Sequence, residues 1–327
     1  MGIIRILKDW TLPVAIVTGG VCYLIFLWVP ALDEMGNQLG PIIDFIFPLT
    51  VFGTLFVTFC KVDFRQMRPH RWHVGILAAQ LLFVVVNVAV ILWLQSDGTQ
   101  KMLWEAALTC VIAPCATAAP VVTGKLGGNI STMSAFTVIS SFVAALMIPL
   151  VFPMLEQTAH ADFWSAFLII LQKVAMVLVL PLVLGWSFQR MAHVSKLIGR
   201  IHRGIVEMPN LSFYCWAFSL TITSGITVKN IVHSGASAGL LLLIAALTLS
   251  ICIIQFCLGR VLGNRLGEHI NCGQALFQKN TALAIWVAYM YLNPIASVGA
   301  GCYVLWQNSI NSVELWLHQK RMKSSLS

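Results

Sequence analysis

The strongest constraint on this chain is a series of ten apolar stretches, each about as long as a membrane span. A bilayer core of roughly 30 Å needs about 20 apolar residues per helix. Charged residues make up only 10% of the 327 positions, against about 25% in soluble proteins. The stretches are Trp10–Val29, Gly40–Cys60, Trp72–Leu94, Met102–Thr123, Ile130–Leu155, Phe163–Phe188, Ile205–Thr227, Val232–Leu262, Gly273–Leu292 and Pro294–Leu317. We therefore expect an all-α membrane protein of ten transmembrane helices, forming a single domain over residues 1–327.

The net charge of +8 is distributed as a membrane topology requires and not as a nucleic-acid interface. Basic residues gather before the first stretch and after the second, fourth, sixth, eighth and tenth, whereas the other loops hold only Lys101 and Lys229 beside acidic residues. This alternation is the positive-inside rule, and it predicts an even number of spans with both termini cytoplasmic. The partner implied is the lipid bilayer, with no nucleic acid.

The N-terminal stretch has a second interpretation, a cleaved signal peptide. Its apolar run from Trp10 is about 20 residues long, whereas the apolar region of a signal peptide has roughly 7–15 residues. The length favours a transmembrane helix.

The stretch Met102–Thr123 contains Pro114 and Pro120, six residues apart around Thr117. Each proline removes a backbone donor and clashes with the preceding turn of a helix. Backbone groups freed in this way are tolerated at membrane depth only inside protein or beside a wet cavity. The sequence therefore predicts a broken helix, with a merely kinked helix as the alternative.

The stretch Gly273–Leu292 carries the polar cluster Gln278, Lys279, Asn280 and Thr281 in its apolar interior. A lysine in the middle of a span costs at least ~2.5–3.5 kcal/mol, and such residues are usually functional. The alternative is a lysine that snorkels to the interface, which apolar residues on both sides of Lys279 disfavour. We assign Lys173, by contrast, a structural role as a snorkelling anchor, and place Asp44, Glu105 and Glu314 at the membrane interfaces.

The two interrupted stretches are the fourth and the ninth, which are equivalent positions in two halves of five helices. Because each half has an odd number of helices, the halves must have inverted topology. Such repeats with paired broken helices near the midplane are a recurring transporter plan. We expect inverted repeats over about residues 10–155 and 163–317, with broken helices 4 and 9 crossing near the midplane and the substrate site where they meet.

The chain resembles the bile acid:sodium symporter superfamily, whose bacterial members are ten-helix inverted-repeat transporters. The resemblance extends over nearly the whole chain and depends on a set of loosely matching motifs. These are Phe52-Gly-Thr-Leu with Val62-Asp63-Phe64, Ala79-Gln80, Pro114 with Thr117-Ala118, Gly128-Asn129, Leu180-Pro-Leu-Val-Leu-Gly185, Lys279-Asn280-Thr-Ala-Leu-Ala and Trp306-Gln-Asn308. It implies a core domain that moves against a panel of helices, a small organic anion as substrate (bile-acid-like, keto-acid-like or pantoate-like), and a location in the cell (inner) membrane.

The chain departs from this family at the sodium sites. Sodium-coupled members carry Ser-Asn where this chain has Ala119-Pro120, and a glutamate followed by Gln-Asn where it has Ala275 and Lys279-Asn280. Alanine and proline offer no side-chain oxygen, and an ammonium repels a cation. The oxygen-bearing side chains that remain at matching positions are Thr137, Gln80 and Asn280. The resemblance with these departures implies a secondary transporter in which Lys279 occupies the niche of the sodium ion.

Either sodium or a proton could therefore be the coupling ion, since a buried lysine could bind and release a proton as the cavity opens to alternate sides of the membrane. A uniporter or exchanger with a permanent internal cation is a further alternative, as are a sodium-dependent symporter and a non-transporting ligand-binding protein. The predicted substrate- and ion-binding residues are Lys279, Asn280, Gln278, Thr281, Thr117, Pro120, Thr137, Gln80 and Asn308. We do not expect this chain to be an enzyme, because the sequence has no zincin motif, no GxSxG motif and no paired membrane carboxylates. Nine scattered cysteines without a CxxC pair predict neither a metal nor a disulfide, and no other cofactor is implied.

Overall fold

A computed structural model describes residues 11–62, 67–94, 98–155, 162–208, 211–233 and 235–324. These residues are helical apart from short connections, and the strand-like pairing among them is one isolated antiparallel bridge. The elements are α2 (Thr11–Trp28), η1 (Pro30–Leu32), α3 (Asp33–Lys61), α4 (Arg71–Leu94), α5 (Thr99–Ile112), α6 (Ala119–Lys125), α7 (Ile130–Leu155), α8 (Phe163–Ala192), α9 (Lys196–Glu207), α10 (Leu211–His233), α11 (Ala238–Leu266), α12 (His269–Phe277), α13 (Thr281–Tyr291) and α14 (Pro294–Ser324).

Within the described ranges, five helices are long and apolar enough to cross a membrane. They are Glu34–Lys61, Arg71–Leu94, Ile130–Leu155, Phe163–Ala192 and Ala238–Leu266. Their outer faces expose large apolar side chains, among them Phe45 at 69%, Val74 at 70% and Leu242 at 71%. Apolar surface of this extent is normally removed from water, so the solvent around these helices is lipid.

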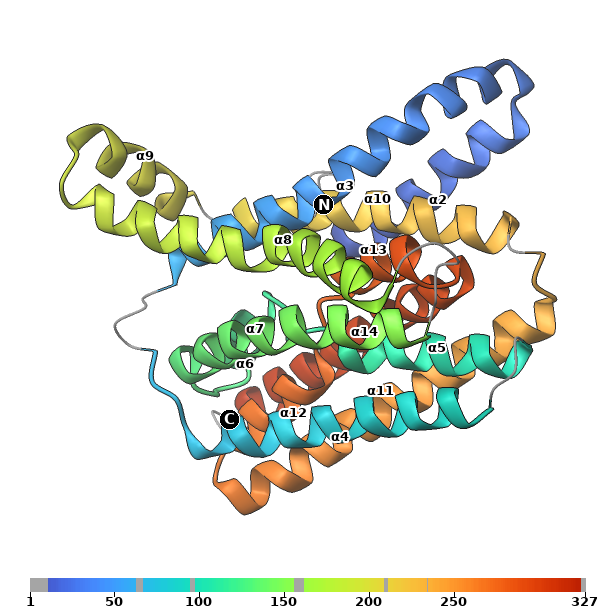
Figure 1. Ribbon diagram of the computed structural model, residues 1–327. Helices are drawn as coiled ribbons and strands as arrows, with labels where there is room; N and C mark the ends of the chain where they lie inside the picture. Colours follow the sequence, from blue (N-terminus) through green and yellow to red (C-terminus); the bar gives the residue numbers. More distant parts are fainter. Residues whose placement is uncertain are drawn as a thin grey trace.

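The helices form two groups that pack against each other (Figure 1). In the first group α2 packs on α10, α3 packs on both α8 and α10, and α9 lies against α8 and α3. The second group contains α4, α5, α6, α7, α11, α12, α13 and α14, with α14 against α5 and α11 against α12. The contact of α11 with α12 depends on Gly259, where an added Cβ would lie 2.6 Å from the carbonyl oxygen of Cys272. We refer to the two groups as the panel and the core.

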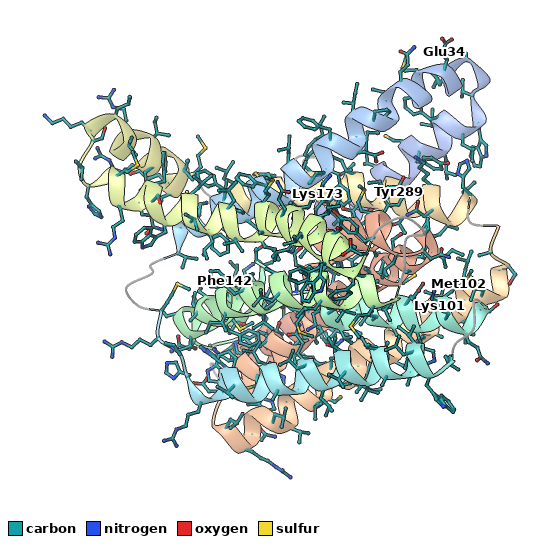
Figure 2. All side chains as sticks on the ribbon, in the orientation of Figure 1. Glu34, Lys101, Met102, Phe142, Lys173 and Tyr289 are labelled. Carbon is teal, nitrogen blue, oxygen red and sulfur yellow. The ribbon has the colours of Figure 1, made fainter. Side chains whose placement is uncertain are left out.

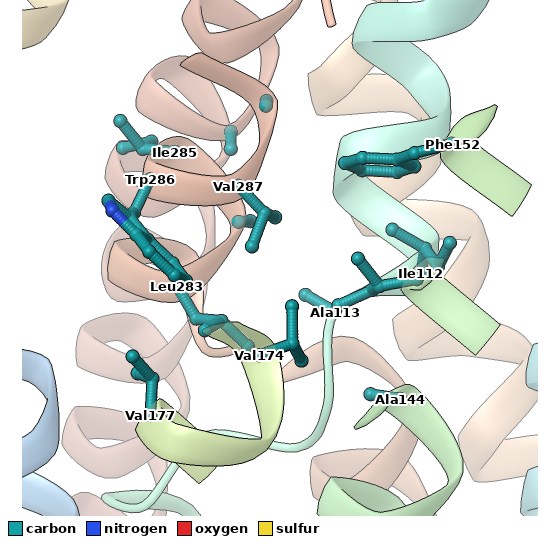
Figure 3. Packing of buried hydrophobic residues seen from close by; sticks show 14 of the residues in the cluster. Ile112, Ala113, Ala144, Phe152, Val174, Val177, Leu283, Ile285, Trp286 and Val287 are labelled. Carbon is teal, nitrogen blue, oxygen red and sulfur yellow. The ribbon is translucent and has the colours of Figure 1, made fainter. Parts of the chain in front are cut away.

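A large apolar cluster joins the panel to the core (Figure 3). Val174 and Val177 of α8 pack beside Leu283 and Trp286 of α13, with Ile112 of α5 in the same cluster. All five side chains are less than 9% exposed. This cluster excludes water from one side of the region where the chain is interrupted.

One expectation from the sequence differs from the structure. The seventh stretch does not begin at Ile205, because residues Lys196–Glu207 form the separate helix α9 and α10 starts at Leu211. Helix α8 is continuous from Phe163 to Ala192, with Lys173 exposed on it (Figure 2). Glu105 is buried within the protein, 3.8 Å from Lys101 one turn earlier.

Candidate functional site

Two helices of the core are interrupted, and their interruptions meet. The chain is non-helical between the end of α5 at Ile112 and the start of α6 at Ala119, and between the end of α12 at Phe277 and the start of α13 at Thr281. The two gaps run antiparallel, with Cys115 opposite Lys279. The amide of Ala116 donates to the Gln278 carbonyl at 3.0 Å, and the amide of Asn280 donates to the Pro114 carbonyl at 2.9 Å. The predicted break at each position is therefore a short extended segment and not a kink.

Polar side chains from neighbouring helices bind the remaining backbone groups of the crossing. The Gln80 amide on α4 donates to the carbonyls of Val111 and Ala113 at 3.2 and 3.0 Å, and Ser140 on α7 accepts from the amide of Cys115 at 3.0 Å. These bonds satisfy groups that a broken helix leaves without partners, which is costly in a membrane interior. They explain why polar residues occur in otherwise apolar helices.

The second interruption is held by α14. Gln307 accepts from the Lys279 amide at 2.9 Å and donates back to the Lys279 carbonyl at 3.2 Å. Tyr303, one turn earlier, donates to the Phe277 carbonyl at 2.7 Å. Neither residue was among those predicted for the site. The signal available was polarity alone, because Trp306-Gln-Asn308 is a polar pair inside an apolar helix.

Lys279 is the most unusual side chain in this region. It is 1% exposed, and its Nζ has no hydrogen-bond partner among the described residues. The thiols of Cys110 and Cys115 lie close enough to interact with it electrostatically, and neither is a carboxylate. A buried charge normally has an ionic or hydrogen-bonding partner. Within the described part of the chain, the Lys279 ammonium is thus an unpaired buried group.

A cavity of about 540 Å³ lies against the crossing, between the panel and the core. This volume falls in the range of roughly 300–1,000 Å³ that is usual for small-molecule sites. Its polar wall comes from the crossing and α14, with Gln278, Lys279, Asn280, Thr281, Thr117, Gln307, Asn308 and Asn311. Its opposite wall is α3, with Val51, Thr54, Leu55, Thr58 and Lys61.

The charges of this cavity all have one sign. Lys61, Lys125 and Lys279 line it, and no aspartate or glutamate is among the described residues that do. A wet cavity with cations of one sign concentrates anions. Lys61 and Lys125 contribute this positive charge directly, whereas the Lys279 ammonium is itself buried beside the cavity wall.

Of the nine predicted site residues, the structure brings seven to this cavity: Gln278, Lys279, Asn280, Thr281, Thr117, Pro120 and Asn308. Gln80 and Thr137 lie outside its lining. Gln80 supports the end of α5, and the Thr137 hydroxyl donates to the Met133 carbonyl of its own helix at 3.0 Å. Asp63 and Phe64, which belong to one of the matching motifs, lie outside the described residues. Lys61, Lys125 and the hydroxyls of Thr54 and Thr58 were not predicted.

A chain of polar contacts leads from the cavity into the core. Gln278 donates to both Asn311, at 3.0 Å, and Gln274, and Gln274 donates to Glu314 at 2.6 Å. Glu314 also forms an ion pair with Arg260. Glu314, expected at an interface, is thus a half-buried partner of this network. The network holds Gln278 in place from the side away from the cavity.

The helical architecture of the described residues, with its apolar outer faces, is that of a polytopic membrane protein. The comparisons with known proteins agree with that class. The model of the SBF-like CPA transporter family matches residues 61–309, and the chain belongs to this family. The comparison with curated proteins found no match. Membership makes the chain a multi-pass membrane protein of a transporter family, related to bile acid:sodium symporters, and not of an enzyme family.

Proposed function

We propose that this protein is a secondary active transporter of a small organic anion, in which Lys279 provides the positive charge that a sodium ion provides in sodium-coupled members. The observation that carries the proposal is Lys279 itself: the residue belongs to the wall of a cavity whose described lining includes three lysines and no acid, and its ammonium is buried without a hydrogen-bond partner among the described residues. An anionic group beside Nζ would give the ammonium the partner that it lacks. The proposed site residues are the seven predicted residues that line the cavity, together with Gln307.

At the positions that match the sodium sites, three oxygen-bearing side chains remain, Thr137, Gln80 and Asn280, and none is a carboxylate. The Asn280 carbonyl oxygen already accepts from the Leu283 amide at 3.2 Å as the cap of α13. The Gln80 carbonyl oxygen has no partner among the described residues and, like Thr137, lies outside the cavity lining. A cation here would also experience the repulsion of Lys279. We therefore propose that sodium does not drive transport, and that the coupling ion is a proton or a second anion in exchange.

The ten-span architecture with inverted repeats, about 10–155 and 163–317 in one domain, is part of the proposal. Any antiparallel bridge has a local two-fold axis, so the bridge alone does not support a repeat. The support comes from which residues are paired. If residues 114, 115 and 116 of the first half correspond to 278, 279 and 280 of the second, exchanging the halves interchanges the two hydrogen bonds of the bridge. The same shift takes Ile130, where α7 begins, to Pro294, where α14 begins.

Helix packing gives the repeat independent support. If α2 and α3 correspond to α8 and α10, the pairing of α2 with α10 corresponds to the pairing of α8 with α3, and both pairs are in contact. The contact between α4 and α5 has its counterpart in the contact between α11 and α12. Both relations are expected of two inverted halves.

Alternating access follows from the position of the cavity between the panel and the core. It reaches Lys61 at the end of α3 and Lys125 at the end of α6. Both lysines lie on the side that the charge pattern makes cytoplasmic, and the apolar cluster of Figure 3 closes the other side. We propose that this conformation faces inward, in the inner membrane of the cell, and that sliding of the core along the panel opens the cluster.

Thermal stability of the purified protein tests the anion specificity. We would measure melting temperature against matched sets of carboxylates, sulfonates, neutral amides and amines, because a ligand that binds the folded state raises it. The expected result is stabilisation by one or more anions that disappears in Lys279→Gln. Stabilisation only by neutral or cationic solutes would refute the proposal. Uptake of the stabilising anion into proteoliposomes, with and without a pH gradient, would then separate transport from binding alone and proton coupling from exchange.

A further inference from the structure

Helix α9 carries an exposed surface that the proposed transport site does not use. It connects α8 to the segment before α10 and extends from the end of the panel (Figure 1). None of its twelve residues is buried. A helix without buried residues is not held by a hydrophobic core, so its apolar side chains must have another environment.

Two parallel rows of side chains follow this helix. The apolar row begins in the preceding turn and contains Val194, Leu197 and Ile201, which are 90%, 65% and 48% exposed. The basic row contains Lys196, Arg200 and Arg203, all exposed, at helical spacings of four and three residues. Glu207, at the last position of α9, is the acidic residue of the helix. The helix is thus apolar along one face and positively charged along the adjacent one.

We propose that α9 is an interfacial helix that binds the anionic headgroup layer of the membrane. A basic amphipathic helix lies in the plane of the interface, with its apolar face among the acyl chains and its basic face toward the headgroups. Each lysine or arginine near an anionic lipid surface strengthens association about fivefold. The exposed apolar row and the basic row satisfy both requirements on the same short helix.

Polar contacts connect α9 to the wall of the cavity. The His202 ring nitrogen lies 3.0 Å from the Cys60 carbonyl at the end of α3, and the Lys61 ammonium donates to the Met208 carbonyl just after α9 at 2.9 Å. Gln189, near the end of α8, donates to the carbonyls of Phe59, Cys60 and Val62. Thr58 and Lys61 of this part of α3 line the cavity. Anionic lipid bound to α9 therefore holds the end of α3, and with it one edge of the cavity.

Hydrogen–deuterium exchange of the full-length protein tests this proposal without any measurement of transport. The protein is reconstituted in nanodiscs of phosphatidylcholine alone or mixed with phosphatidylglycerol, and amide exchange is followed over residues 196–207. We expect exchange in α9 to slow roughly tenfold or more with phosphatidylglycerol, since several basic residues act together. Equal exchange in the two lipids would overturn the proposal.

Two charge-matched variants make the test specific. Lys196→Gln/Arg200→Gln/Arg203→Gln should lose the effect of phosphatidylglycerol. Arg68→Gln/Arg71→Gln/Arg265→Gln removes three exposed positive charges outside α9 and should retain it. Loss of the effect in both variants would indicate general charge attraction and contradict a site on α9. Equal protection by soluble glycerol phosphate in phosphatidylcholine nanodiscs would indicate a small-anion site and would also overturn the proposal. None of these outcomes depends on whether the melting-temperature screen of the proposed function finds a stabilising anion.

Discussion

The two interruptions pair with each other through one backbone bridge, but they differ in length and carry very different side chains. The first presents Ala116, Thr117, Ala118 and Pro120 to the cavity, whereas the second presents Gln278, Lys279, Asn280 and Thr281. At the bridge itself, the first contributes Cys115 and the second Lys279. The backbone crossing is therefore a shared framework, and the polar and charged groups for binding come mainly from one of its two halves. Predictions for matched positions in the two halves test this division.

The largest expected effect is on anion binding by Lys279→Gln. Removing one partner of a buried charge pair costs about 2–5 kcal/mol, so the variant should bind any stabilising anion at least tens of times more weakly. Cys115→Ala changes the matched residue of the first interruption and should leave the affinity nearly unchanged. Titration of the anion by isothermal calorimetry measures both. Equal losses in the two variants would contradict the division between the halves.

In the absence of ligand, removing the charge of Lys279 should stabilise the protein. Lys279 is a buried cation without a hydrogen-bond partner among the described residues, and even buried ion pairs, replaced by apolar residues of similar volume, often leave a protein about 1–4 kcal/mol more stable. We expect Lys279→Met to melt at a higher temperature than the native protein in the absence of anion. A lower melting temperature would mean that Lys279 has a stabilising partner in the unliganded protein.

A smaller effect is expected from the side chains that hold the crossing. Gln307→Ala leaves the amide and carbonyl of Lys279 without their side-chain partner, and a buried unsatisfied group costs about 1–3 kcal/mol. Ser140→Ala removes the acceptor of the Cys115 amide and a bond to the Thr137 carbonyl. It should lower the melting temperature less, because the Thr137 carbonyl also accepts from Ser141. Gln307→Ala should also weaken anion binding, because the position of Lys279 is no longer fixed. An anion affinity equal to that of the native protein would limit Gln307 to a structural role.

The smallest effect is expected from Pro114→Ala. The proline has no amide hydrogen, and its carbonyl accepts from Asn280, which alanine can do equally well. Loss of a proline raises the entropy of the unfolded chain, at a cost of about 0.4–1 kcal/mol. Melting temperature should fall slightly and anion affinity should not change. A large loss of either would mean that the proline, and not the pairing of the two segments, maintains the break.

Local sequence signals were sufficient to locate the two interruptions. Two prolines in one apolar stretch and a polar cluster in another marked the two segments, and both are interrupted. Prolines alone are not decisive, because α3 and α7 each contain two and are continuous. The polar cluster supplied four of the seven predicted residues that line the cavity, Thr117 and Pro120 belong to the proline-containing stretch, and Asn308 was predicted from the family resemblance. Their part in substrate binding stays a prediction.

Features that depend on distant parts of the chain were not predictable in this way. Gln307 and Ser140 are polar residues in apolar helices, but their partners are backbone groups 28 and 25 residues away. The residues of helix α9 were predicted mainly as a basic loop, because a short segment rich in charge lacks the long apolar run that marks a span. The burial of Glu105 by neighbouring helices likewise depends on distant segments, and its position near a helix end did not indicate it.

The measurement that tests the central claim most directly is a titration of the purified native protein with sodium chloride, replaced by choline chloride at constant ionic strength, with melting temperature as the readout. Ligands that bind only the folded state raise this temperature. If Lys279 takes the place of the coupling cation, sodium and choline will give the same melting temperature at every concentration. A saturable rise specific to sodium would contradict the account and indicate an ordinary sodium symporter.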